Sequence, residues 1–144
     1  MVRVAKCSVD MVQSSPHIQA LIDEYAGLAI VPDPQVQWDT YKMLESAGKL
    51  TVFGAFSDSD LIGFATVMDN VSLHYGKVIT MTESLFVAQR YRKTGAGALL
   101  IRAIEKHAED IGSARTMITA PHGTVLGRVL TGCGYQQSHE VYYK

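Results

Sequence analysis

Residues 83–108 read ESLFVAQRYRKTGAGALLIRAIEKHA, and this stretch decides the fold. Through Ala88 it is apolar and rich in β-forming residues, which is typical of a strand. From Gly95 to Ile111 apolar residues recur along one helical stripe, with charged residues on the other side. Between the two lies a basic turn with two glycines, so the order is strand, turn, helix.

The turn has the properties of a phosphate-binding site. A helix N-terminus has about four backbone N–H groups without partners and carries the positive end of the helix dipole. Glycines let these groups approach an anion closely, and Arg90, Arg92 and Lys93 add positive charge. A P-loop does not fit, because Lys93-Thr94 precede the glycines. A dinucleotide fingerprint does not fit either, because Leu100 stands where its third glycine is needed.

The segment before the turn predicts an antiparallel meander. Strands over 50–56 and 61–67 flank the hairpin turn Ser57–Asp60. A second turn at Tyr75–Lys77 then leads into a strand over 78–88. A meander before the turn argues against a βαβ unit, whose strands are parallel.

The two ends of the chain complete an α/β arrangement. We expect a strand over 2–9, a helix over about 17–29 and a second helix that ends at Gly48. After the central helix we expect a strand over 114–120, a helix over about 124–130 and a final strand or hairpin through Val141–Tyr143. The predicted order is βααβββαβαβ(β). Since neither repeats nor linkers interrupt it, residues 1–144 are expected to form one domain.

The six residues Arg92-Lys93-Thr94-Gly95-Ala96-Gly97 spell Arg-x-x-Gly-x-Gly. With the strand before it and the helix after it, this sequence resembles the central motif of the GCN5-related N-acetyltransferase (GNAT) family. The resemblance covers roughly residues 50–143. It implies a mixed, mostly antiparallel sheet flanked by helices, and an enzyme that transfers the acetyl group of acetyl-CoA directly to an amine.

The resemblance also implies which residues bind coenzyme A. Backbone amides of the motif would hold its pyrophosphate, contributed by Arg92, Lys93, Thr94, Gly95, Ala96 and Gly97. The backbone of Leu85, Phe86 and Val87 would pair with the pantetheine arm. An N–H near Phe86 would polarise the thioester carbonyl, as an oxyanion hole does.

Glu83 is the predicted general base, because amine acetylation requires a neutral amine. It lies on the strand that resembles the one where the family often carries a catalytic glutamate. We expect its neighbour Ser84 on the opposite face of that strand. The alternative is that Glu83 merely occupies the solvated face of an edge strand.

The general acid is harder to assign. The family's usual tyrosine position aligns with Leu130, and the asparagine that usually touches pantetheine is replaced by His122-Gly123. Tyr135, next to Gly134, is the candidate acid, and His122, Tyr142 and Tyr143 are alternatives. These departures favour a second hypothesis, a catalytically silent acyl-CoA-binding sensor or interaction module.

Further candidates are the remaining histidines and the cysteines. We expect His107 to be solvated on the helix flank. Cys7 and Cys133 have no metal-ligand spacing, so the sequence predicts no metal and two reduced thiols.

Composition restricts the partners. The formal net charge is −1, which provides no overall field for nucleic acid or an anionic membrane. No apolar run approaches the roughly 20 residues of a membrane helix, and no signal peptide is evident, so we expect a cytoplasmic protein.

The expected acceptor is a small-molecule or peptide amine. Tyr25, Trp38 and Tyr41 either line its entrance or belong to the core. The resemblance suggests a homodimer.

Overall fold

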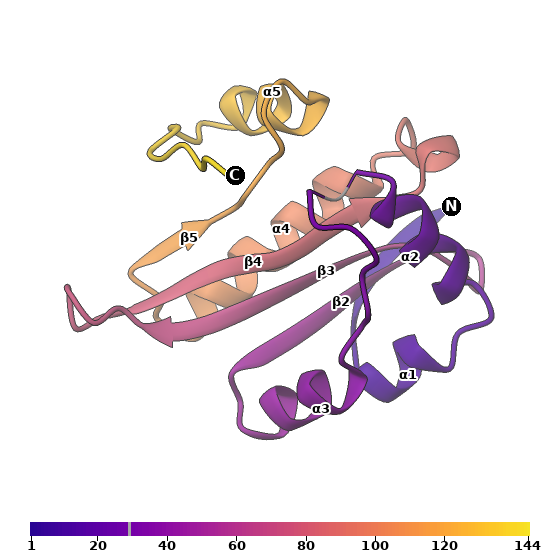
Figure 1. The fold of residues 1–144 in the computed structure, drawn as a ribbon, viewed down its shortest axis with the longest axis horizontal. Helices are drawn as coiled ribbons and strands as arrows, with labels where there is room; N and C mark the ends of the chain where they lie inside the picture. The colour runs from indigo at the N-terminus through magenta and orange to yellow at the C-terminus, as the bar shows by residue number, and fades with distance from the viewer. Residues whose placement is uncertain (29) are drawn as a thin grey trace.

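The computed structural model describes residues 1–28 and 30–144, and these form one sheet with helices on both faces (Figure 1). The described strands follow one another in the order β1-β2-β3-β4-β5. The first four are antiparallel neighbours, and β5 is parallel to β4. Their bounds are β1 Val2–Cys7, β2 Leu50–Ser57, β3 Asp60–Val71, β4 Val78–Val87 and β5 Arg115–Met117. The predicted mixed, mostly antiparallel α/β sheet is confirmed.

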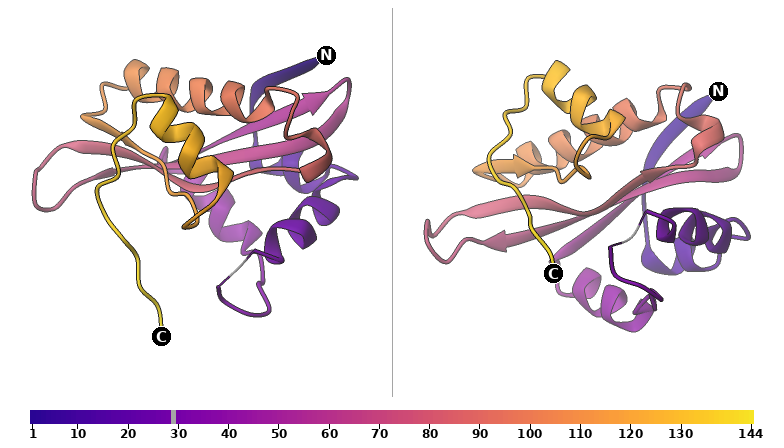
Figure 2. Two further views of the ribbon diagram at one scale, coloured as in Figure 1. Left: turned by 90° about the horizontal axis from the view of Figure 1, so that it is seen from above. Right: turned by 45° about the horizontal axis from the view of Figure 1, so that its top comes forward.

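The helices divide between the two faces of the sheet (Figure 2). Helix α4, the longest, covers one face, and three shorter helices near the N-terminus lie on the other. Helix α5 follows β5. The bounds are α1 Val9–Gln13, α2 Ile18–Ala26, α3 Trp38–Ser46, α4 Ala96–Asp110 and α5 Val125–Gly132, with a 3₁₀ turn η1 at Gln89–Tyr91. No helix in the part of the chain that the structure describes is long and apolar enough to cross a bilayer.

Alternation along the strands builds a core on each face. In β2, Val52 and Phe56 pack under α1–α3, whereas Phe53 and Ala55 pack under α4. Both sets are buried, because a strand covered on two faces needs apolar residues at every position. The predicted stripe of α4 supplies Leu100 and Ile104 to the second core.

The N-terminal region differs from its prediction in two ways. The first strand ends at Cys7, two residues early, because Ser8 caps a helix that was not expected: its Oγ accepts a hydrogen bond from the Met11 N–H at 3.0 Å. At five residues, α1 is too short to show a helical period. The next helix ends at Ala26 rather than near residue 29, and Ala29 itself lies outside the described residues.

The C-terminal region contains the larger correction. The strand expected over 114–120 pairs only over Arg115–Met117, and the final strand through Val141–Tyr143 is wrong. Val141, Tyr142 and Tyr143 are exposed and outside the sheet. Their β-propensity is insufficient because a strand also requires a neighbour that accepts its backbone hydrogen bonds.

Candidate active site

The predicted phosphate-binding turn lies at the N-terminus of α4. Gly95 is its N-cap and adopts a left-handed conformation, φ 88°, that favours glycine. Thr94 Oγ1 donates to the carbonyl of Tyr91, which tightens the preceding turn. Over residues 92–98, all of which the structure describes, four backbone N–H groups donate to no protein acceptor, those of Lys93, Gly95, Gly97 and Ala98. We call this set the cradle.

The cradle has room for an anion. A Cβ built on Gly95 or on Gly97 would meet no atom within 4 Å. Lys93 is exposed beside it, but the Arg92 side chain turns back, with its Nε donating to the carbonyl of Val87 at 2.9 Å. Unpaired donors, open space and the helix dipole therefore fit the pyrophosphate of coenzyme A.

Strands β4 and β5 separate just before the cradle. Their backbones pair only from Ile79 to Met81, and the next contact is the Thr119 N–H donating to Thr82 Oγ1 at 3.0 Å. From Leu85 to Val87, β4 has β3 on one side and no strand on the other.

The free edge involves two of the three residues that the sequence indicated. The Ala88 N–H donates to the Ile62 carbonyl across β3 at 2.9 Å. Since backbone direction alternates along a strand, Phe86 also faces β3, and Leu85 and Val87 face the open side. The N–H groups of Leu85 and Val87, the two neighbours of Phe86, are therefore free at this edge, whereas the Val87 carbonyl already accepts from Arg92.

A β-bulge places Glu83 on the sheet face that carries α3. Thr66 of β3 pairs with Ser84 and Val67 pairs with Thr82, so Glu83 is the extra residue opposite them. The bulge brings Glu83 and Ser84 to the same side, where Thr66 Oγ1 lies 2.5 Å from Glu83 Oε2 and 2.6 Å from Ser84 Oγ. The expectation that Ser84 lies on the opposite face is wrong for this reason.

Helix α3 contributes the third hydroxyl of this network. The Tyr41 hydroxyl donates a short hydrogen bond to Glu83 Oε1. Because the Thr66 proton goes to Oε2, Thr66 accepts from Ser84. Burial, together with the hydrogen bond to Glu83 and its charge, raises the pKa of Tyr41 well above its ordinary value. Tyr41 therefore stays a phenol. The sequence named it as an entrance or core residue, but its contact with Glu83 was not predicted, because 42 positions separate the two.

Comparison with known families decides the assignment of this chain. The profile of the acetyltransferase (GNAT) family matches residues 18–135, most of the chain. This protein belongs to the GNAT family. No curated protein matches the chain significantly.

Solved structures confirm the GNAT fold. The ribosomal-protein-alanine N-acetyltransferase from Brucella melitensis biovar Abortus 2308 superposes with a TM-score of 0.73 at 19% identity, covering 99% of this chain and 96% of its own. AAC(6')-Iy, in complex with the bisubstrate analog CoA-S-monomethyl-acetylneamine, gives 0.77 at 19% identity, with 100% and 97% covered. The glucosamine-6-phosphate N-acetyltransferase from Arabidopsis thaliana gives 0.76 at 14% identity, again with 100% and 97% covered.

Tyr135, the candidate acid in this GNAT chain, lies away from the Glu83 network. Its hydroxyl is buried without a hydrogen-bond partner among the described residues. Burial, followed by the charge of Glu105 on α4, raises the pKa of Tyr135 to about 12. Because Glu105 belongs to the helix on the other face of the sheet, the structure does not bring Tyr135 to Glu83. Leu130, at the family's usual tyrosine position, is buried.

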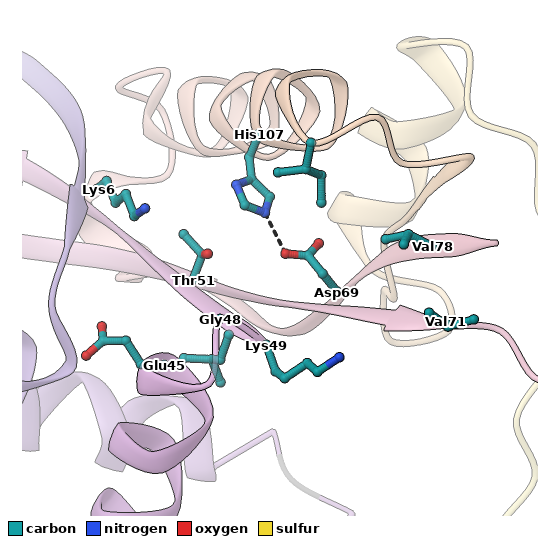
Figure 3. Close-up of a pocket in the computed structure, with 11 residues that line it drawn as sticks. Lys6, Glu45, Gly48, Lys49, Thr51, Asp69, Val71, Val78 and His107 are labelled. Atoms are coloured by element: carbon teal, nitrogen blue, oxygen red, sulfur yellow. Dashed lines mark hydrogen bonds and ion pairs between the residues drawn. The ribbon is translucent and has the colours of Figure 1, made fainter.

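His107 is not solvated as expected. Its Nε2 lies 2.7 Å from Asp69 Oδ2, and Thr80 Oγ1 donates to the other oxygen of Asp69 at 2.7 Å. Figure 3 shows His107 reaching from α4 toward Asp69. The pair lines a cavity of about 440 Å³, whose lining also includes Lys6 and Thr51. The cavity lies at the C-terminal end of α4, opposite the cradle. Sequence could not predict the pair, since its members are 38 positions apart.

The aromatic residues of the N-terminal helices are half-buried and pack against the core. Tyr25 packs edge-on against Phe64, with 5.9 Å between ring centroids, and Trp38 packs beside Tyr41 at 6.2 Å. Glu24 is also engaged, because its Oε2 accepts from the Gln89 N–H at 2.9 Å. Of the three aromatics, Tyr41 is the one that reaches Glu83.

Among the described residues, no three His, Cys, Asp or Glu side chains gather as metal ligands do. Cys7 is buried and Cys133 is exposed, and both are free thiols.

Proposed function

We propose that this chain transfers the acetyl group of acetyl-CoA directly to an amine, with Glu83 as the general base. One relationship carries the proposal: the free edge of β4 runs from the Glu83 bulge to the cradle. Along this edge lie, in order, a phosphate site, a backbone edge for an extended arm and a carboxylate. The proposed reaction requires the same order: pyrophosphate, pantetheine arm, and amine at the thioester.

Acetyl-CoA supplies the acetyl thioester: an amide C–N bond forms, the C–S bond breaks, and coenzyme A leaves as its thiol. The cradle N–H groups of Lys93, Gly95, Gly97 and Ala98 would bind the pyrophosphate, with Arg92, Thr94 and Ala96 shaping the turn. Leu85 and Val87 would pair with the pantetheine arm. Their N–H groups are the candidates for polarising the carbonyl, in place of one near Phe86.

Glu83 has the geometry of a base that remains accessible. Each of its oxygens accepts one hydrogen bond, from Tyr41 or from Thr66, and a carboxylate oxygen has two lone pairs. One acceptor position on each oxygen is therefore free for an ammonium proton or a bridging water. The side chain is exposed on the sheet face, so an amine can reach it.

The alternative is a silent acyl-CoA-binding module, and one observation favours it. Neither Leu130 nor Tyr135 offers a hydroxyl to the leaving thiolate near Glu83. Water at the open β4 edge can supply that proton, because the thiolate is a good leaving group and takes up its proton after the C–S bond breaks. We therefore place the transferase first.

The experiment follows coenzyme A release from acetyl-CoA with a panel of primary amines. Glu83→Gln should lower kcat by about 10²- to 10⁴-fold, the usual contribution of a general base, while acetyl-CoA binding is retained. Glu109→Gln is the matched control, because Glu109 is exposed on α4. Turnover that is equal in the parent and Glu83→Gln would refute the role of Glu83. Binding without turnover on any amine would favour the silent module.

A further inference from the structure

Three methionines lie side by side across three strands next to Glu83. Met68 of β3 pairs with Met81 of β4, and Met81 pairs with Met117 of β5. Directly paired residues on neighbouring strands point to the same face of a sheet. We call Met68, Met81 and Met117 the methionine row.

The methionine row lies in a cavity that also contains Glu83. The cavity measures about 450 Å³, and the described residues that line it come from strands β3, β4 and β5 and from Ser72, which follows β3. Its other lining residues are Asn70, Ser72, Ile79 and Thr82. Met81 and Glu83 are two positions apart on one strand, so their side chains share a face about 7 Å apart along β4.

From this arrangement we infer that the acceptor is a primary amine carrying an apolar alkyl or aryl group. The inference rests on the proposed acetyl transfer at Glu83. The amino group lies at Glu83, and the apolar group lies along the methionine row, which spans about 10 Å across three strands. Thioether side chains adapt to apolar groups of varied shape, so the row suits a chain or a ring.

The charges of the cavity argue against two other kinds of amine. Among the described residues that line the cavity, Glu83 is the one that carries a charge. An amino sugar carries several ammonium groups, and only one of them could pair with Glu83. The others would lie in the cavity without a carboxylate partner, which is unfavourable. A sugar phosphate would find no cation there, since Arg115, which pairs with Ile79, is not part of the lining.

The test compares kcat/KM for hexylamine and ethylamine, two acceptors with similar basicity and different apolar length. Each buried methylene contributes about fourfold in binding, so hexylamine should be the better acceptor by at least about tenfold. Glucosamine-6-phosphate and neamine complete the panel as the phosphorylated and polycationic amines, and both should be poorer than hexylamine.

Two variants assign the preference to the methionine row. Met81→Lys should lower kcat/KM for hexylamine at least about tenfold and change ethylamine less, because it places a cation beside the apolar group. Met11→Lys is the matched control, since Met11 is an exposed methionine on α1 outside the cavity. Met117→Ala shortens the row without adding charge and should also reduce the ratio of hexylamine to ethylamine.

The outcomes separate this inference from the proposed function. Equal kcat/KM for hexylamine and ethylamine, or a preference for glucosamine-6-phosphate or neamine, would overturn the apolar acceptor and leave acetyl transfer standing. A folded protein that binds acetyl-CoA but acetylates none of these amines would contradict the inference and the transferase proposal together.

Discussion

The Tyr41 hydroxyl of α3 donates a hydrogen bond to Glu83 in the bulge of β4. This contact joins an N-terminal helix to the strand that carries the candidate base. It orients one carboxylate oxygen, while Thr66 orients the other. Tyr41 is thus a positioning residue for Glu83.

Tyr41→Phe should lower kcat roughly tenfold, because loss of a hydrogen bond to a charged group costs about 1.5 kcal/mol or more. The KM for acetyl-CoA should not change, since the cradle is untouched. Tyr75→Phe is the control, because Tyr75 is exposed in the β3–β4 turn. Steady-state kinetics on all three proteins would decide, and equal kcat values would show that Glu83 is oriented without Tyr41.

Alkaline stability provides a second test of the same contact. The raised pKa means that folded Tyr41 binds its proton more tightly than an unfolded tyrosine, whose pKa is near 10. The resulting stabilisation is present below pH 10 and decreases as the pH rises toward the folded pKa. Urea unfolding at pH 8 and pH 11 should therefore show a larger loss in the parent than in Tyr41→Phe. Equal losses would mean that Tyr41 titrates normally.

Tyr135→Phe should leave kcat unchanged. The variant removes a buried hydroxyl that has no hydrogen-bond partner among the described residues and lies near Glu105, so the free energy of unfolding should change by no more than about 1 kcal/mol. Kinetics and urea unfolding measure the two effects. A fall in kcat of tenfold or more would instead show that Tyr135 reaches the leaving thiolate.

The Asp69–His107 pair should contribute to stability but not to acetyl-CoA binding. Asp69→Asn should lower the free energy of unfolding by about 1–3 kcal/mol, because both partners are largely buried. Lys106→Ala breaks an exposed pair with Asp110 on the same helix and should cost less than about 0.5 kcal/mol. Equal losses in the two variants would contradict a stabilising role for the buried pair.

The sequence predicts the sheet between Leu50 and Val87, together with α4, because both have strong local signals: alternation, turn residues and an amphipathic stripe. The cradle is predictable for the same reason, since one contiguous motif forms it. Helix α1 could not be predicted, because five residues are too short to show a helical period. The final strand was predicted wrongly, because a strand depends on a neighbouring strand that local sequence does not reveal.

The bulge and the Glu83 network lie beyond local pattern. A bulge is a relation between two strands, and nothing in MTESLF, residues 81–86, indicates that Glu83 is the extra residue. The partners of Glu83 come from α3 and β3, which the fold brings together. The methionine row is equally a consequence of register between distant segments.

The measurement that tests the central claim most directly is the melting temperature of the protein with and without acetyl-CoA. Ligand at about 100 times its Kd adds roughly 2.7 kcal/mol, which raises Tm by about 5–10 °C in a domain of this size. Gly97→Val should fold, because its Cβ meets no protein atom, but it should fill the cradle and abolish the shift. Gly127→Val, at an equally open helical position on α5, should keep the shift. A shift that survives in Gly97→Val, or no shift in the parent, would contradict coenzyme A binding at the α4 N-terminus.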